Sequence, residues 1–239
     1  KDINGNVINK IEDKNAVIIS FLDGKQIVDP SIDKCNEIGR IIGNLHNLTV
    51  NFKEFRKNSL GFSEWKNLYK KCMDSDSKKF HFILNELELE LNFIQNNWPK
   101  NLPSGIIHAD LFKDNVFFKG NKVSGIIDFY FSCHYFLIYD IAIVINDWCF
   151  DKDKKTFNKD YFKVILSSYN RERKILNDEL KALNVILRAA AVRILITRLY
   201  DYIYHPSDAL VIKKNPLEYA EILKWHQQNI ISENDINLH

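Results

Sequence analysis

The feature that most constrains the fold is a predicted β-hairpin that directly follows a polar loop. The loop reads HADLFKDN, residues 108–115, and comes after the apolar run SGII. The apolar stretches NVFFK and KVSGIID follow it and meet at Gly120-Asn121. A Gly-Asn pair between apolar runs is typical of a tight turn between antiparallel strands. The sequence therefore places the polar side chains of the loop next to a rigid pair of strands.

Three polar side chains around this hairpin are predicted to face one space. Asp110 and Asn115 flank the start of the hairpin, and Asp128 ends its second strand in GIIDFY. Because Asn115 and Asp128 both lie near the open end of the hairpin, their oxygens can share one Mg²⁺ ion, which prefers oxygen ligands. Asp110 can accept a proton from an attacking hydroxyl. A solvated loop with an aspartate that caps a turn is the alternative interpretation.

The order of these residues is the layout of a kinase catalytic loop: His-x-Asp, four residues, Asn, and a later metal-binding Asp. Further motifs extend the likeness from about Asn58 to Tyr219. They are NSLGFSEW, SGIIDFYFS, YDIAIVINDWCF, RLYDY and NPLEY. Taken together, the motifs resemble the bacterial homoserine kinases of the aminoglycoside phosphotransferase and choline kinase superfamily. Phe112 and IDFYF depart from the usual aminoglycoside-kinase forms and favour the homoserine kinases.

The resemblance implies ATP and Mg²⁺ as cofactors, L-homoserine as the acceptor and O-phospho-L-homoserine as the product, a step towards threonine. It implies Asp110 as the catalytic base, with Asn115 and Asp128 as the metal ligands. The implied residues around adenine are the hinge backbone at Ser20, Phe21 and Leu22, together with Phe117 and Ile127. His108 and Asp140 are expected to be structural residues that brace the loop.

Homoserine carries a carboxylate and an ammonium group, and the planar fork of an arginine matches a carboxylate. Arg188, Arg193 and Arg198 recur at intervals of five on one predicted helix. Successive members point about 140° apart, so the three cannot share a face. The residues expected to bind the acceptor are Arg198, then Arg193, with Asp147 for the ammonium and Tyr130 and Trp148 as aromatic walls. Ordinary ion pairs and core packing are the alternative for this set.

Hydrophobic periodicity predicts one β-hairpin among many helices. The resemblance implies an α+β fold of the protein-kinase-like type, with a mostly helical C-terminal lobe, a catalytic β-hairpin and a remnant of an N-terminal β lobe. The turn chemistry of Asn4, Gly5 and Asn6 indicates a tight hairpin near the start. His46 is expected to cap or pack the end of its helix. The predicted elements are a buried strand at 16–24 and helices at 33–48, 65–72, 79–98, 139–150, 158–170, 178–204 and 216–229.

Two parts of a kinase N-terminal lobe are missing from the sequence. No glycine-rich loop precedes residue 16, and Lys10 and Lys14 lie too close to the expected hinge to contact phosphates. We therefore expect an N-terminally truncated kinase. Its expected division is residues 1–22 as the remnant and hinge and residues 23–239 as the catalytic and substrate-binding lobe. A remnant that binds nucleotide without catalysis is one alternative.

The composition of the chain argues against several classes of function. A net charge of +2, with lysines scattered along the chain, argues against nucleic acid as a partner. No run approaches the roughly 20 apolar residues of a membrane span, and the four cysteines form no CxxC pair. We expect a cytoplasmic protein with reduced thiols and no membrane partner. Two other activities stay open: a kinase for choline or an aminoglycoside, and a metal-dependent hydrolase that uses His108, Asp110 and Asp128.

Overall fold

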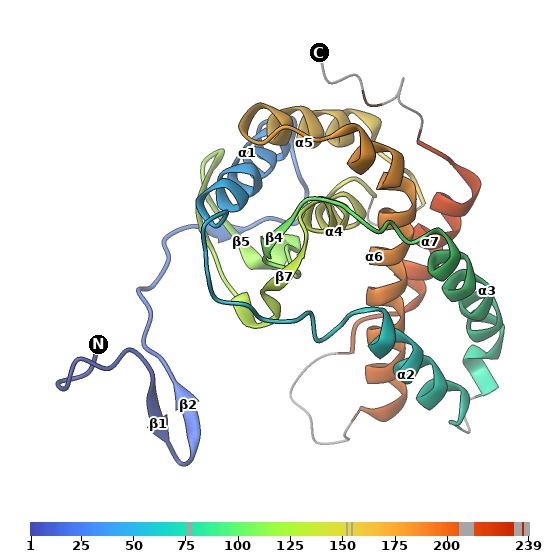
Figure 1. The fold of residues 1–239 in the computed structure, drawn as a ribbon, viewed down its shortest axis with the longest axis horizontal. Coiled ribbons are helices and arrows are strands. Elements are labelled where there is room, and N and C mark those ends of the chain that lie inside the picture. The colour runs from blue at the N-terminus through green and yellow to red at the C-terminus, as the bar shows by residue number, and fades with distance from the viewer. Residues whose placement is uncertain (76–77, 152, 154, 206–212, 232–235, 237–239) are drawn as a thin grey trace.

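The computed structural model describes all residues except 76–77, 152, 154, 206–212, 232–235 and 237–239. Within the described part, short strands lie beside a larger helical body (Figure 1). The strands are β1 Asn9–Ile11, β2 Lys14–Ala16, β3 Lys25–Gln26, β4 Ser104–Ile107, β5 Val116–Lys119, β6 Lys122–Ile126 and β7 Cys133–Phe136. The helices are α1 Ile32–Leu48, α2 Phe62–Met73, α3 His81–Asn97, α4 Ile138–Trp148, α5 Lys159–Glu172, α6 Asn177–Tyr204 and α7 Leu217–Gln228. Single 3₁₀ turns occupy Lys78–Phe80, Lys113–Asn115 and Phe129–Phe131.

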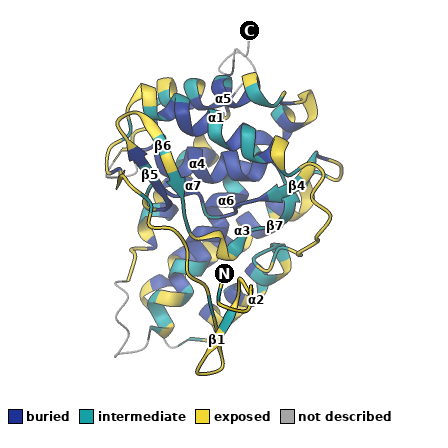
Figure 2. Ribbon diagram, turned by 90° about the vertical axis from the view of Figure 1, so that its left-hand side faces the viewer, coloured by how far each residue is buried: buried dark blue, intermediate teal, exposed yellow. Residues whose placement is uncertain are grey.

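Helix α4 lies at the centre of the helical body. Every one of its residues is buried, as the dark blue ribbon of α4 in Figure 2 shows. The long helix α6 packs against α4 on one side and also contacts α2, α3 and α7. Helices α1 and α5 pack against each other and cover α4 from above in the view of Figure 1. The core therefore forms a rigid base beneath the strands that carry the polar loop.

Two antiparallel strand pairs hold the loop and the end of the hairpin. Strand β4 leads into the loop and pairs with β7, with Ile107 opposite Cys133. Strands β5 and β6 form the predicted hairpin and turn at Gly120, whose φ of 63° suits a residue without a side chain. The loop after β4 and the turn after β6 therefore emerge next to each other.

The predicted buried strand at residues 16–24 is wrong. Only Ala16 belongs to a strand, and Ile18 and Phe21 are 96% and 94% exposed. A strand needs a neighbour to receive its backbone hydrogen bonds, and no described strand lies beside residues 17–22. The strand was predicted from apolar composition alone, and apolar composition does not supply the neighbouring strand.

The N-terminal hairpin is real but turns later than expected. Gly5, with a φ of 84°, does form a tight turn, in which the amide of Asp2 donates to the carbonyl of Asn6. The paired strands, however, are β1 and β2, which turn at Glu12 and Asp13. Both of these residues have positive φ, as a two-residue hairpin turn requires. This hairpin projects away from the helical body (Figure 1).

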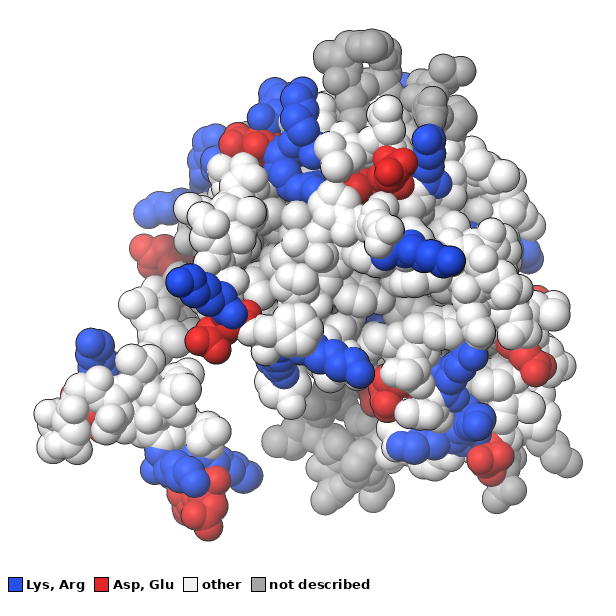
Figure 3. Space-filling model, viewed as in Figure 1, with Lys and Arg blue, Asp and Glu red and all other residues white. Residues whose placement is uncertain are grey.

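The predicted α+β fold and the seven predicted helices are confirmed, each helix within a few residues of its expected bounds. All four cysteines are buried and free. Strand β7 was not predicted. None of the described helices is both long enough and apolar enough to span a membrane. Basic and acidic side chains are interspersed over the face in Figure 3. The expected division at residue 22, the cytoplasmic location and the lack of a nucleic-acid partner stay predictions.

Candidate active site

The polar loop after β4 is held in place by Asp140 at the start of α4. Its Oδ2 accepts from the amide of His108 and its Oδ1 from the amide of Ala109, each at 2.7 Å. Asp140 is fully buried, and these donors compensate its carboxylate for the loss of water. Ala109 has a φ of 65°, a left-handed conformation that costs energy outside glycine and persists only where the surroundings enforce it. These contacts are those of the bracing role expected for Asp140.

His108 links the loop to the end of the hairpin. Its Nδ1 accepts from the amide of Asp110 at 3.2 Å, so its Nε2 carries the proton and donates to the carbonyl of Ile127 at 2.9 Å. Ile127 directly precedes Asp128. Both ring nitrogens are therefore used within the protein. This arrangement argues against the hydrolase interpretation, which needs His108 as a metal ligand.

The carboxylate of Asp110 is held from two sides. Asn115 donates through Nδ2 to the carbonyl of Asp110 at 2.8 Å and to its Oδ2 at 3.3 Å. Arg193 of α6 places Nη1 3.2 Å from Oδ1. Burial raises the pKa of Asp110 above its ordinary value, and the charge and hydrogen bond of Arg193 oppose that rise. Asp110 is thus a partly buried, oriented carboxylate.

Asp110, Asn115 and Asp128 line one cavity of about 420 Å³, which we call the Asp110 cavity. Asp128 adopts a φ of 63°, which turns the chain sharply after β6. Because Asn115 donates with its nitrogen towards Asp110, its amide oxygen remains as an acceptor. An amide oxygen and a carboxylate fit Mg²⁺, which also keeps waters and phosphate oxygens. The donor set therefore fits the expected metal.

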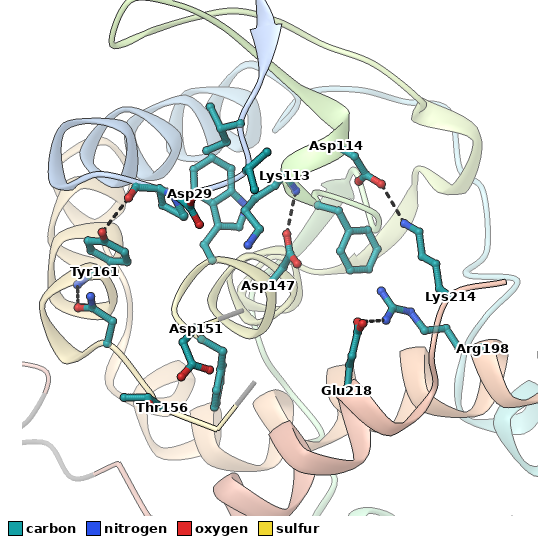
Figure 4. Close-up of a pocket in the computed structure, with 17 residues that line it drawn as sticks. Asp29, Lys113, Asp114, Asp147, Asp151, Thr156, Tyr161, Arg198, Lys214 and Glu218 are labelled. Atoms are coloured by element: carbon teal, nitrogen blue, oxygen red, sulfur yellow. Dashed lines mark hydrogen bonds and ion pairs between the residues drawn. The ribbon is translucent and has the colours of Figure 1, made fainter. Parts of the chain in front are cut away.

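A second cavity, of about 590 Å³, adjoins the first and is drawn in Figure 4; we call it the Asp147 cavity. Phe112, Asp114, Arg198 and Lys214 line both cavities. Oδ2 of Asp147 accepts from the amide of Lys113 at 2.8 Å, which fixes the middle of the polar loop (Figure 4).

Ion pairs cross the wall between the two cavities. Lys214 lies 2.9 Å from Asp114, and Arg198 lies 2.7 Å from Glu218 (Figure 4). Arg198 also lies over the ring of Tyr219, 4.6 Å from its centre. The wall therefore joins the loop to the start of α7 and to the residues before it.

The residues expected to bind the acceptor lie in different parts of the structure. Arg193 contacts Asp110 directly, while Arg198 lies on the wall between the cavities. Asp147 and Trp148 line the Asp147 cavity. Tyr130 lines neither cavity and is 70% exposed. The ring of the adjacent Phe131 lines the Asp110 cavity in its place.

Of the residues expected around adenine, Leu22, Phe117 and Ile127 have described contacts with or within the hairpin. The side chain of Leu22 lies against Gly125 of β6, and Gly125 is the register partner of Phe117. Ile127 donates its amide to the carbonyl of Asn115 at 3.0 Å. Leu22 and Phe117 therefore lie on the same face of the hairpin, while the adenine-binding roles of all five residues stay predictions.

Sequence reasoning missed three polar residues of the Asp110 cavity: Thr197, Asp201 and Lys214. Thr197 and Asp201 follow Arg193 at intervals of four on α6, which places all three on one face of the helix. Burial raises the pKa of Asp201. The four-residue spacing from Arg193 is the signal that would have found the first two residues.

The fold is shared with solved phosphotransferases. An amicoumacin kinase in complex with AMP-PNP, Ca²⁺ and Ami superposes with a TM-score of 0.65, at 14% identity, over 95% of this chain and 69% of that one. A Plasmodium vivax ethanolamine kinase gives a TM-score of 0.63, at 17% identity, over 94% and 68%. These likenesses show that the chain has a protein-kinase-like fold.

Sequence comparison identifies the family to which the chain belongs. Residues 3–173 match the phosphotransferase enzyme family. The homoserine kinase of Rhizobium meliloti (strain 1021) is 40% identical over 228 residues, which are 95% of this chain and 70% of the relative. That of Bartonella tribocorum (strain CIP 105476 / IBS 506) is 42% identical over 223 residues, or 93% and 68%. The chain belongs to the phosphotransferase enzyme family, in its homoserine kinase branch.

Proposed function

We propose that this protein transfers the γ-phosphoryl group of ATP to the side-chain hydroxyl of L-homoserine, which yields O-phospho-L-homoserine. The observation that carries the proposal is the close likeness to homoserine kinases, about 40% identical over 95% of this chain. The Asp110 cavity supports it, because a kinase catalytic loop lies there in the order that phosphoryl transfer requires.

Asp110 orients the acceptor hydroxyl and takes its proton. The carboxylate is partly buried, held by Asn115 and Arg193, and open to the cavity. A base that is fixed before the substrate arrives loses little orientational freedom in the reaction. Burial raises the pKa of this carboxyl, and the charge and hydrogen bond of Arg193 oppose that rise, which favours the ionised form.

Asn115 and Asp128 would hold Mg²⁺. When bound, the ion neutralises charge on the transferred phosphoryl group. The hinge backbone at Ser20, Phe21 and Leu22 would face adenine, with Phe117 and Ile127 against the ring.

The acceptor would lie in the Asp110 cavity, between Asp110 and the wall formed by Arg198. The guanidinium of Arg198 is the cation offered to the substrate carboxylate, and Glu218 accepts a hydrogen bond from it. Asp147 lies beyond the wall, so a direct contact with the ammonium requires the substrate to extend into the Asp147 cavity. Trp148 then forms the floor of that cavity.

A panel of acceptors tests the proposal. ADP release by the full-length protein is measured with L-homoserine, choline, ethanolamine and an aminoglycoside, each with Mg-ATP. Turnover with homoserine and none with the others is expected. Turnover with choline and none with homoserine would defeat the proposal. If the 239-residue chain binds Mg-ATP in a calorimeter and turns over homoserine, the inactive-remnant alternative fails.

A further inference from the structure

Among the residues that the structure describes, four carboxylates line the Asp110 cavity, and one of them has neither an ion-pair partner nor a proposed role. The four belong to Asp110, Asp114, Asp128 and Asp201. The first two pair with a cation at 3.2 Å and 2.9 Å, and the third is the proposed metal ligand. Asp201 is the remaining one. It keeps access to solvent, so a ligand in the cavity can reach its carboxylate.

Helix α6 presents Asp201 on the side that also carries the partner of the base. Arg193, Thr197 and Asp201 follow one another at intervals of four, and all three line the Asp110 cavity. At a rise of about 1.5 Å per residue, Asp201 lies about 12 Å along the helix from Arg193. Side chains of a helix lean towards its N-terminal end, which brings the carboxylate of Asp201 back towards Asp110. The cavity therefore has the base at one place and an unpaired carboxylate farther along α6.

A cation that is held apart from Asp201 lies beside it. Arg198 precedes Asp201 by three residues, a spacing that makes two side chains neighbours on a helix. Its guanidinium nevertheless contacts Glu218 at 2.7 Å, and no ion pair joins it to Asp201 in the described part of the chain. Both Arg198 and Asp201 line the Asp110 cavity. Neighbouring opposite charges that do not neutralise each other are complementary to a zwitterion whose carboxylate and ammonium are attached to one carbon.

The rest of the cavity suits the other end of such an acceptor. Leu60, Leu68 and Phe131 give it apolar walls, against which the two methylenes of homoserine can pack. The hydroxyl oxygen and the ammonium nitrogen of homoserine are separated by four bonds. With one hydrogen bond at each end, the molecule joins two carboxylates that lie up to about 10 Å apart. A homoserine whose hydroxyl contacts Asp110 therefore has a reach of this size along α6 towards Asp201.

Asp147, the aspartate expected for the ammonium, is placed differently. It lines the Asp147 cavity and not the Asp110 cavity. Its Oδ2 accepts from the amide of Lys113 at 2.8 Å, a contact that holds the polar loop. Asp201, in contrast, lies in the cavity that contains the base. These positions favour Asp201 as the residue that meets the amino group.

We infer that the carboxylate of Asp201 binds the ammonium group of the acceptor, beside Arg198 at the acceptor carboxylate, so that α6 selects an α-amino acid by its zwitterionic head group. The inference rests on the proposed phosphoryl transfer to homoserine and adds the residue that recognises the amino group. Partial burial raises the pKa of Asp201, and the charge of His205 opposes that rise. A carboxylate that has lost part of its hydration gains more from a bound cation than a fully hydrated one.

A pair of acceptors isolates the contact. 4-Hydroxybutanoate is homoserine without its amino group, so it keeps the hydroxyl and the carboxylate. In the full-length enzyme, Asp201→Asn should lower kcat/KM for L-homoserine by about 10- to 100-fold, the loss expected for one hydrogen bond between charged groups. The change should appear mainly in KM, because Asp201 does not contact the reacting atoms, and kcat/KM for 4-hydroxybutanoate should stay within about threefold of the parental value. Equal losses with both acceptors would overturn the inference.

Asp178→Asn is the matched control, because Asp178 is an exposed carboxylate on the same helix with a lysine 3.8 Å away. It should keep the parental kinetics with both acceptors. Asp201→Glu returns the charge and should recover part of the loss with L-homoserine. If Asp201→Glu is no better than Asp201→Asn with L-homoserine, the charge is not what the acceptor contacts, and the inference fails.

The hand of the acceptor gives a second readout. Contacts at the hydroxyl, the carboxylate and the ammonium fix three points of homoserine, and three fixed points distinguish its two enantiomers. The parental enzyme should therefore prefer L-homoserine over D-homoserine by at least about tenfold in kcat/KM. Asp201→Asn should reduce that preference, and an unchanged preference in the variant would contradict the inference.

The same measurements separate this inference from the proposed function. If the parental enzyme turns over L-homoserine and Asp201→Asn loses activity equally with both acceptors, only the inference fails. If the parental enzyme turns over choline and not homoserine, the proposed function fails, and the test then compares choline with its uncharged isostere 3,3-dimethylbutan-1-ol. A loss confined to choline in Asp201→Asn keeps Asp201 as the ammonium site, whereas equal losses with choline and the isostere overturn it.

Discussion

Arg193 places Nη1 3.2 Å from Oδ1 of Asp110, and this arginine is only 4% exposed. Its guanidinium also lies over the ring of Phe131, 5.4 Å from its centre. Among the residues that the structure describes, Arg193 forms an ion pair with one carboxylate, and that carboxylate is the proposed base. Asn115 contacts the other carboxylate oxygen, Oδ2, at 3.3 Å, so both oxygens of the proposed base are held by neighbouring side chains. Arg193 contacts the proposed base, while Arg198 lies on the wall between the two cavities.

Asp110→Asn should lower kcat by about 10²- to 10⁴-fold, because the amide cannot take the proton of the acceptor hydroxyl. Binding of Mg-ATP should be nearly unchanged, since Asn115 and Asp128 remain. ADP release and calorimetry measure the two quantities. Asp178→Asn is the control, since Asp178 is an exposed carboxylate with a lysine 3.8 Å away, on the same helix as Arg193. Near-normal turnover of Asp110→Asn would show that Asp110 is not the catalytic base.

Arg193→Met should shift the acidic limb of the pH profile of kcat/KM to higher pH. The base acts as a carboxylate, so activity is lost as pH falls through its pKa. Arg193 lowers the pKa of Asp110 against the rise caused by burial, and its removal lets that pKa rise further. The profile is measured from pH 5 upward, a range that begins about one unit above an ordinary aspartate pKa.

Arg188→Met serves as the control for the Arg193 variant. Arg188 lies on the same helix but pairs with Glu90 at 2.5 Å, away from the Asp110 cavity. The variant should lose stability and keep the parental acidic limb. An acidic limb that does not move in Arg193→Met would show that another group controls the profile.

Asp128→Asn should raise the Mg²⁺ concentration needed for half-maximal activity by at least about tenfold. Loss of a residue that merely supports a metal ligand costs about 10- to 100-fold in affinity, and a direct ligand should cost no less. The measurement is a Mg²⁺ titration of turnover at saturating ATP. Asp114→Asn provides the comparison, because Asp114 pairs with Lys214 and lies next to Asn115. Equal Mg²⁺ requirements in parent and Asp128→Asn would contradict the metal role.

Sequence patterns predicted those parts of the molecule that depend on local chemistry. The hairpin follows from two apolar runs and the Gly120-Asn121 turn, and the helices follow from their periodicity. Residues 17–22 were mispredicted because a strand depends on a neighbour that the local pattern does not reveal. The contact between His46 and Asp140 joins residues 94 positions apart, so no spacing rule indicates it. Its discovery required the packing of α1, α4 and α5.

His226 should make the folded state less stable as pH falls below 6.5. Burial, followed by the charge of Arg188, lowers its pKa from 6.5 to about 3. Between these values the unfolded chain binds a proton that the folded chain excludes, so the free energy of unfolding falls with decreasing pH. At pH 5 this group alone should cost about 2 kcal/mol relative to neutral pH. Denaturant unfolding at pH 7 and pH 5 measures the difference. His226→Gln keeps a donor for Asn146 and should flatten the dependence, whereas the exposed control His81→Gln should retain the parental slope. An equally steep dependence in His226→Gln would assign the effect to other groups.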